Sequence, residues 1–172
     1  LNAKLPVIAR NSEHTKSFAL KELSNSEHFA EVEFWLEGDL IHDNHVPKTG
    51  EYYSKGFMDL IFVREINGIK RYSILDWKSD RLESDDYSNY KAIKEKVDKE
   101  YAVQRVLYSY CLIQWLKQFY PGLSEDEIFE QHFGGIYYAF VRGTANGTAN
   151  GIYAQTWDSY KTLKDNYDTL KT

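Results

Sequence analysis

The sequence lacks the features that mark several large classes of protein. It has one cysteine, Cys111, so it can form neither a disulfide framework nor a cysteine-based zinc site, and a reducing compartment suits it. No segment approaches the roughly 18 to 20 consecutive apolar residues of a membrane span, and the first residues show no signal-peptide pattern. We therefore expect a cytoplasmic protein that makes no contact with a membrane.

Positive charge is scarce as well. The 21 lysines and arginines are outnumbered by 26 aspartates and glutamates, which gives a net charge of −5. This balance argues against a protein that coats nucleic acid electrostatically, although an enzyme can still grip nucleic acid locally through metal ions. The phosphate-binding pattern G-x-x-x-x-G-K-[ST] is absent, so we expect no ATP-driven motor within these residues.

The chain is instead rich in apolar segments. Hydrophobic residues make up 42% of its 172 positions, enough for one domain with a substantial core. Alternation and β-branched or aromatic content predict strands at 29–36, 56–65 and 71–78, with a loop at 37–54. Asn67-Gly68 is a strong two-residue turn signal between the second and third of these strands. The sequence therefore predicts an antiparallel hairpin.

Three charged residues interrupt this apolar hairpin. Asp59 lies on one strand, and Asp76 and Lys78 lie two apart on the other, where they point to the same face. Burying such groups costs several kcal/mol unless they are paired, hydrogen-bonded or bound to a metal. If Asp59 faces the same side, two carboxylates and an ammonium converge in an arrangement that can hold Mg²⁺ and activate water. The alternative is a surface ion pair of little energetic value, because D-x-K occurs by chance in many proteins.

The remaining segments complete an α/β pattern. Gln104 and Tyr108 are four residues apart and so share one helix face. Either they act in the functional site, or they only border the buried face of the helix. The C-terminal helix carries an apolar stripe that we assign to core packing rather than to base stacking. The elements expected here are a short helix at 17–23, a long helix within 87–120, a strand at 136–142, a polar loop at 143–150 and an amphipathic helix at 156–170.

Several segments together resemble the RecB-type nuclease domain, a branch of the PD-(D/E)XK nuclease fold. The segments G-F-M-D-L-I-F, L-D-W-K-S and Y-A-V-Q-R-V-L-Y-S-Y are similar to its consecutive motifs in order and spacing. Upstream A-E-V-E-F-W-L, and downstream H-F-G-G-I-Y-Y-A-F-V-R-G and G-I-Y, resemble the C-terminal domain of exodeoxyribonuclease V beta subunits. The resemblance runs from about residue 20 to residue 153, and it implies a mixed central sheet flanked by helices.

The resemblance also implies roles for individual residues. Asp59 and Asp76 would be metal-binding carboxylates, Trp77 would offer its backbone carbonyl to the metal, Lys78 would be the catalytic lysine, and Gln104 and Tyr108 would form the Q-x-x-x-Y motif that positions DNA or the catalytic groups. The D-x-K position holds Asp where many relatives have Glu, and Met58 replaces the proline of the fold's name. Both departures are normal for the RecB-like branch.

One departure is larger. The family has a metal-binding histidine upstream, in a G-x-x-x-H type motif that we do not find in this sequence. We read His14, His28, His42 and His45 as solvated and His132 as structural. With Leu as the first residue, we expect residues 1–172 to be a single nuclease domain that begins after the histidine-bearing helix and lacks the helicase motor. We expect it to bind metal weakly and to cut DNA poorly by itself.

The resemblance implies a Mg²⁺-dependent deoxyribonuclease that hydrolyses single strands during double-strand-break processing and recombinational repair. The implied partners are DNA and RecC-like and RecD-like subunits, ATP serves only the helicase segment, and the location is the bacterial cytoplasm near the nucleoid. Two alternatives remain open. One is a catalytically silent module for DNA binding or subunit docking, and the other is a stand-alone RecB-like nuclease of phage or defence systems.

Overall fold

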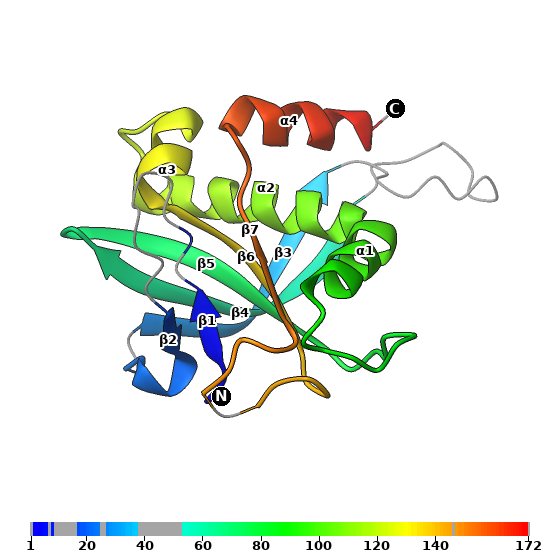
Figure 1. The fold of residues 1–172 in the computed structure, drawn as a ribbon. Helices are drawn as coiled ribbons and strands as arrows, with labels where there is room; N and C mark the ends of the chain where they lie inside the picture. The colour runs from blue at the N-terminus through cyan, green and yellow to red at the C-terminus, as the bar shows by residue number, and fades with distance from the viewer. Residues whose placement is uncertain are drawn as a thin grey trace.

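A five-stranded mixed sheet forms the centre of the computed structural model, which describes residues 2–6, 8, 17–24, 27–37, 53–145 and 147–171 (Figure 1). The strand order is β3-β4-β5-β6-β7; β5 and β6 are parallel and the other neighbours are antiparallel. The strands are β3 (His28–Glu37), β4 (Tyr53–Ile66), β5 (Ile69–Lys78), β6 (Phe133–Phe140) and β7 (Ile152–Gln155). This confirms the predicted mixed α/β fold, and the architecture is compatible with the PD-(D/E)XK type.

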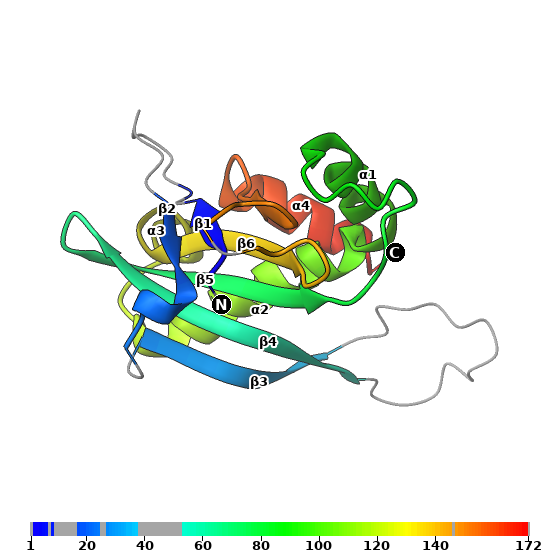
Figure 2. The same ribbon diagram turned by 60° about the horizontal axis from the view of Figure 1, so that its bottom comes forward.

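The two faces of the sheet are covered differently. Four helices of the described part pack on one face and build the larger core: α1 (Tyr90–Glu100), α2 (Ala102–Phe119), α3 (Glu125–His132) and α4 (Tyr160–Thr169). A second core on the other face is closed by the pair β1 (Lys4–Pro6) and β2 (Ser17–Ala19) and by the 3-10 turn η1 (Leu20–Glu22), in front of the sheet in Figure 2. Side-chain alternation separates the cores, since Ile74 joins the first and Leu75 the second.

The predicted hairpin is confirmed in detail. Asn67 and Gly68 form its turn with φ values of 54° and 79°, the left-handed pair that a two-residue hairpin of this kind needs.

The C-terminal helix is also confirmed as α4, with Leu163 and Tyr167 fully buried on its inner stripe. Cys111 is a core residue of α2, as expected, and its burial raises the pKa of the thiol to about 12.

One prediction of local structure is wrong, and the structure adds two helices to those predicted. The short helix at 17–23 is wrong, because Phe18 pairs with Leu5 and becomes core, which leaves only one 3-10 turn. The long helix predicted within 87–120 is confirmed as α2, and the same range also contains α1, which is separated from α2 at Tyr101 by a φ of −123° and a ψ of 13°. We did not predict α3, although Ser124 and Glu127 form a capping box that is visible as S-x-x-E in the sequence. Most of the predicted loop, 38–52, lies outside the described residues.

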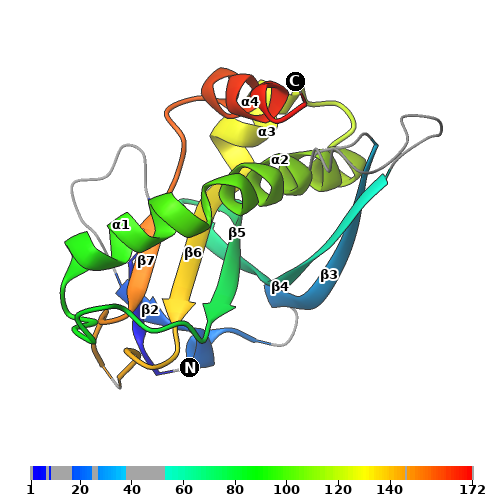
Figure 3. The same cartoon turned by 90° about the vertical axis from the view of Figure 1, so that its right-hand side faces the viewer.

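A kink in β3 and β4 shapes the centre of the sheet. Ala30 pairs with Leu60 and Val32 with Met58, so Glu31 stands opposite Asp59, and Glu31 has a φ of 52°. The kink explains why apolar residues in 29–36 do not alternate evenly. Beyond the pairing of Leu60 with Leu75 the ladder between β4 and β5 ends, and Figure 3 shows β3 and β4 running to one side, away from the ends of β5 and β6.

No helix within the described ranges combines the length and the apolar character that crossing a membrane would require.

Gly135 on β6 offers a test of the packing. Its φ is +96°, and an added Cβ would lie 2.7 Å from the carbonyl oxygen of Gln155. We expect Gly135→Ala to destabilise the fold by more than the about 1–2 kcal/mol of left-handed strain alone. Gly68→Ala is the matched control, because Gly68 has a φ of +79° but open space around its Cβ position. Urea denaturation would contradict the packing around β6 if both variants lost the same stability.

Candidate functional site

The candidate site lies where β4 and β5 part, beneath the start of α2, a region that can be followed in Figure 3. The side chains that the sequence singled out lie together there: hydrogen bonds and an ion pair connect Asp76, Lys78, Gln104 and Tyr108, and Asp59 bonds to the backbone N–H of Trp77, the residue after Asp76. We call these five residues the charged cluster.

Asp59 reaches across the gap between the strands. Its Oδ2 accepts a hydrogen bond of 2.9 Å from the backbone N–H of Trp77. Carrying the antiparallel register one step beyond Leu60 and Leu75 puts Asp59 opposite Asp76, where side chains share a face. The Asp59 carboxylate therefore replaces a backbone carbonyl as the acceptor of this hydrogen bond. It lies beside the peptide bond that joins Asp76 to Trp77.

Asp76 and Lys78 form a buried ion pair. Asp76 Oδ2 and Lys78 Nζ are 2.6 Å apart, and their side chains are only 5% and 9% exposed. Asp76 and Lys78 are therefore not a solvent-exposed surface ion pair, which was the alternative that the sequence left open. Charges buried to this extent are costly to maintain unless they are compensated. Burial raises the pKa of Asp76, Lys78 opposes the rise, and the negative charge of Asp59 adds to it.

Two residues of α2 complete the cluster. Gln104 accepts a bond of 2.8 Å from Lys78 Nζ, and its Nε2 donates to Asp76 Oδ1 at 3.3 Å and to the Tyr108 hydroxyl at 3.0 Å. Tyr108 in turn donates to the carbonyl oxygen of Phe57 at 2.7 Å. Gln104 and Tyr108 thus connect α2 to both β4 and β5. Residues that only bordered the buried face of a helix would not need these contacts.

Aromatic rings that the sequence did not single out also contact the cluster. Lys78 Nζ lies 3.9 Å from the ring centroid of Tyr101 and 5.2 Å from that of Tyr138. Tyr101 donates its hydroxyl hydrogen to Asp80, and this bond holds the pKa of Asp80 below its usual range. Both tyrosines lie in segments that resemble the RecB-type domain, but the sequence did not reveal their contact with Lys78, because that contact depends on how α2 and β6 pack against β5.

The cluster offers hard oxygen ligands from two carboxylates. Among the described residues, no three His, Cys, Asp or Glu side chains are grouped closely enough to hold a metal ion. Two carboxylates nevertheless fit Mg²⁺, which is usually held by one or two of them together with substrate phosphate. The backbone carbonyl of Trp77 as a further ligand stays a prediction.

Neither of the two histidines that the structure describes, His28 and His132, has a hydrogen bond to the charged cluster. The Nδ1 atom of His28 lies 3.1 Å from the Ser24 carbonyl oxygen, and His132 stacks on Tyr120 with Nδ1 2.9 Å from the Lys70 carbonyl oxygen. These contacts agree with a structural role for His132. The other three histidines, at positions 14, 42 and 45, lie outside the described residues.

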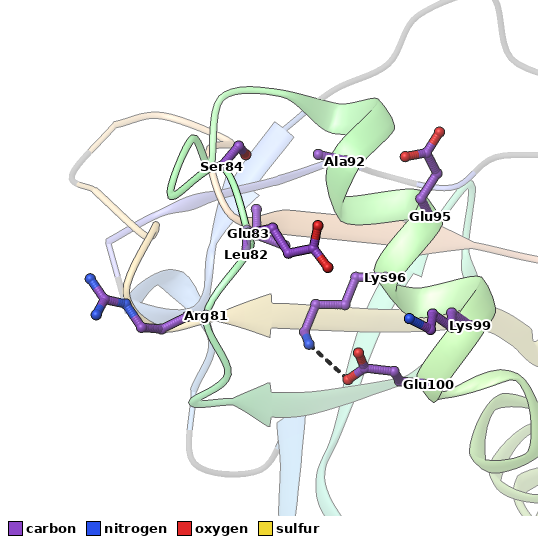
Figure 4. Close-up of a pocket in the computed structure, with 9 residues that line it drawn as sticks. All are labelled: Arg81, Leu82, Glu83, Ser84, Ala92, Glu95, Lys96, Lys99 and Glu100. Carbon is purple, nitrogen blue, oxygen red and sulfur yellow. Dashed lines mark hydrogen bonds and ion pairs between the residues drawn. The ribbon is translucent and has the colours of Figure 1, made fainter.

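A pocket of about 320 Å³ adjoins the site, between α1 and the segment that follows Asp80 (Figure 4). Its lining contains three cationic and three acidic side chains, and Lys96 and Glu100 pair at 2.7 Å: the charged residues are Arg81, Glu83, Glu95, Lys96, Lys99 and Glu100. Because these charges balance and the pocket holds no member of the charged cluster, it gives no preference for a phosphate.

Comparison with known proteins gives three curated relatives, each described as "RecBCD enzyme subunit RecB". The one from Buchnera aphidicola subsp. Schizaphis graminum (strain Sg) is 37% identical over 91 residues, 52% of this chain. Those from Buchnera aphidicola subsp. Acyrthosiphon pisum (strain APS) and Escherichia coli (strain K12) are 30% and 35% identical over 63% and 58% of it. The matched segments amount to only 7%, 9% and 8% of the relatives' own lengths. No protein-family model matches the chain.

Proposed function

Because the chain carries a RecB-type region, we propose that it hydrolyses phosphodiester bonds in single strands of DNA, as the nuclease part of a RecB-like helicase-nuclease in recombination and repair. The observation that carries this proposal is the buried charged cluster, in which one carboxylate is paired with an ammonium and another faces it across the parted strands. A fold would not maintain this costly arrangement for stability alone, since apolar residues of similar volume are often at least as stable.

The residues of the cluster divide the chemistry among them. Asp59 and Asp76 would hold Mg²⁺, with the Trp77 carbonyl as a further ligand. Bound Mg²⁺ supplies Lewis acidity toward the phosphate and makes water a stronger nucleophile. Lys78 would stabilise negative charge that develops on the phosphoryl group, and Gln104 would hold Lys78 and Asp76 in fixed positions. Tyr108 would position Gln104 against the strands.

Delivery of the substrate would fall to other parts of the parent enzyme. A net charge of −5 attracts no DNA over long range. RecC-like and RecD-like subunits and an ATP-using helicase segment would bring a single strand to the site, in the bacterial cytoplasm near the nucleoid. These partners form part of the proposal and rest on the resemblance to RecB.

One observation favours a second candidate function. With no group of three ligating side chains among the described residues, the cluster could be a silent module that serves DNA binding or subunit docking. Such a module would bind DNA without cutting it, and metal would not alter its affinity for DNA.

Metal dependence separates the two candidates. We expect the 172-residue chain to bind Mn²⁺ weakly in calorimetric titration and to cut a fluorescent single strand slowly, because two carboxylates hold a divalent ion loosely. Excess EDTA should stop cleavage, and a blunt duplex of the same sequence should be cut less. The same assay on a longer polypeptide that contains the chain would separate a silent site from one that needs further residues. Cleavage that persists in EDTA would refute the metal-dependent proposal.

A further inference from the structure

The ammonium group of Lys78 is surrounded in an unusual way. An ammonium has three N–H donors, and two of its neighbours are acceptors: Asp76 Oδ2 at 2.6 Å and Gln104 Oε1 at 2.8 Å. Its other close neighbours are the stacked rings of Tyr101 and Tyr138, with centroids 5.5 Å apart and planes 24° from parallel. Within the described part of the chain, one donor is therefore left for a further acceptor, while aromatic rings cover one side of the cation.

We propose that Tyr101 is a positioning residue for Lys78, and that its ring face, backed by Tyr138, holds Nζ so that the third donor meets an oxygen of the reacting phosphate. This inference rests on the proposed nuclease function of the charged cluster. Tyr101 acts through Lys78 and does not touch the substrate itself.

An aromatic face suits this task better than another carboxylate. The quadrupole of the ring attracts a buried cation without carrying a net charge. It therefore neither competes with Asp59 and Asp76 for a divalent ion nor repels a phosphate that approaches Lys78. A metal ion bound to Asp76 would weaken the attraction between Asp76 and Lys78. The attraction between the Tyr101 ring and Nζ would persist, because the ring does not bind the metal.

Tyr101 is fixed in place from three directions. Its backbone joins α1 to α2, with its N–H bonded to the Val97 carbonyl at 2.9 Å and a ψ of 13° that interrupts the helix. Its hydroxyl donates to the carboxylate of Asp80, two residues beyond Lys78. Its ring stacks on Tyr138, which lies opposite Asp76 in the parallel register. The helix break thus has a purpose that the helical pattern of the sequence did not reveal.

A graded series of ring substitutions tests the proposal. We expect Tyr101→Phe to retain most cleavage, and fluorinated phenylalanines at this position to lower kcat stepwise, because fluorine draws electrons from the ring face with little change of shape. Tyr101→Leu should lower kcat by about tenfold or more, with Mn²⁺ affinity and KM unchanged. Tyr90→Leu is the matched control, since Tyr90 also begins a helix and stacks on a tyrosine, Tyr153, away from the cluster. A purely structural role would leave kcat insensitive to fluorination.

A second measurement does not depend on cleavage. In protein labelled with ¹³C-lysine, the ε-methylene signals of Lys78, assigned by their loss in Lys78→Arg, should be shifted upfield by the ring current of Tyr101. Tyr101→Leu should remove that shift, and Tyr90→Leu should not. An unshifted Lys78 signal would overturn the proposal whether or not the chain cuts DNA. A shifted signal together with no cleavage by the wild-type protein would instead overturn the proposed function and leave Tyr101 a structural role.

Discussion

Replacing Asp76 with alanine is expected to abolish DNA cleavage, with a loss of more than about a hundredfold. The substitution removes a carboxylate that the proposal assigns to the metal, so hydrolysis is lost while the remaining chain is intact. In a longer polypeptide that also contains the proposed helicase segment, DNA unwinding should continue, because the substitution lies outside that segment. Cleavage of a labelled single strand and strand separation of a duplex, measured on the same preparation, check both halves of the prediction.

The same substitution should cost stability. The Lys78 side chain is 9% exposed, and without Asp76 its ammonium lacks its ion-pair partner, a situation that typically costs about 3–5 kcal/mol. Asp165→Ala on α4 is the control, because its partner Lys161 is 79% exposed and the pair lies in water. Urea denaturation should separate the two variants clearly, and normal cleavage by a folded Asp76→Ala protein would show that the site was wrongly assigned.

Replacing Lys78 with methionine is expected to remove cleavage and to preserve metal binding. Methionine retains the apolar stem but not the charge that would stabilise the phosphoryl group, so the rate should fall by about a hundredfold or more. The carboxylates of Asp59 and Asp76 stay in place, and Mn²⁺ titration should still detect them. Rapid cleavage by this variant, or loss of Mn²⁺ binding with the fold intact, would contradict the division of roles.

The Lys78→Met variant should also have a distinctive pH profile of stability. Burial already raises the pKa of Asp76, and Lys78 is the group that opposes this rise. In Lys78→Met the pKa of Asp76 should therefore rise further, and a carboxyl group with a raised folded pKa stabilises the fold at low pH and loses that contribution as pH rises through the folded value. We expect the stability deficit against wild type, measured in EDTA, to be small near pH 4 and to grow toward pH 7.

A double substitution checks that this effect arises from the pair. Asp76→Asn combined with Lys78→Met removes both charges, so much of the stability lost in Asp76→Asn alone or in Lys78→Met alone should return. A deficit of equal size at every pH, or a double variant no more stable than the singles, would show that the two groups do not compensate each other.

Local chemistry in the sequence determined the hairpin and one half of the site. Asn67 and Gly68 tolerate the positive φ values that a tight turn requires, and this property belongs to the two residues themselves. Once the turn and the strand period are known, Asp76 and Lys78 must share a face because they are two apart. The same kind of local signal, a capping box at Ser124 and Glu127, marks the start of α3.

Other features were decided only by packing between distant segments. Residues 17–23 have a helical composition, but burial of Phe18 against Leu5 and Phe62 made a strand more favourable. The separation of α1 from α2 at Tyr101 is marked by no Gly or Pro in the sequence, and the Tyr101 ring near Lys78 is held by Asp80 and Tyr138. Contacts across tens of residues carry no local signature, because their free energy arises only when the segments have already been brought together.

The charged cluster shows most clearly which features the sequence determined and which depended on the tertiary structure. The sequence by itself determined which carboxylates and which ammonium interrupt the apolar strands, since burial of charge must be compensated wherever it occurs. Only the tertiary structure decided that the compensation comes from one ion pair, a glutamine on α2 and two aromatic rings. It also decided that β4 and β5 part beside Asp59, which stands opposite a kink at Glu31 that no Gly, Pro or Asn marks in the sequence. The physical reason is that a strand can distort without a sequence signal when its neighbours in the sheet and the helix above it supply the lost contacts.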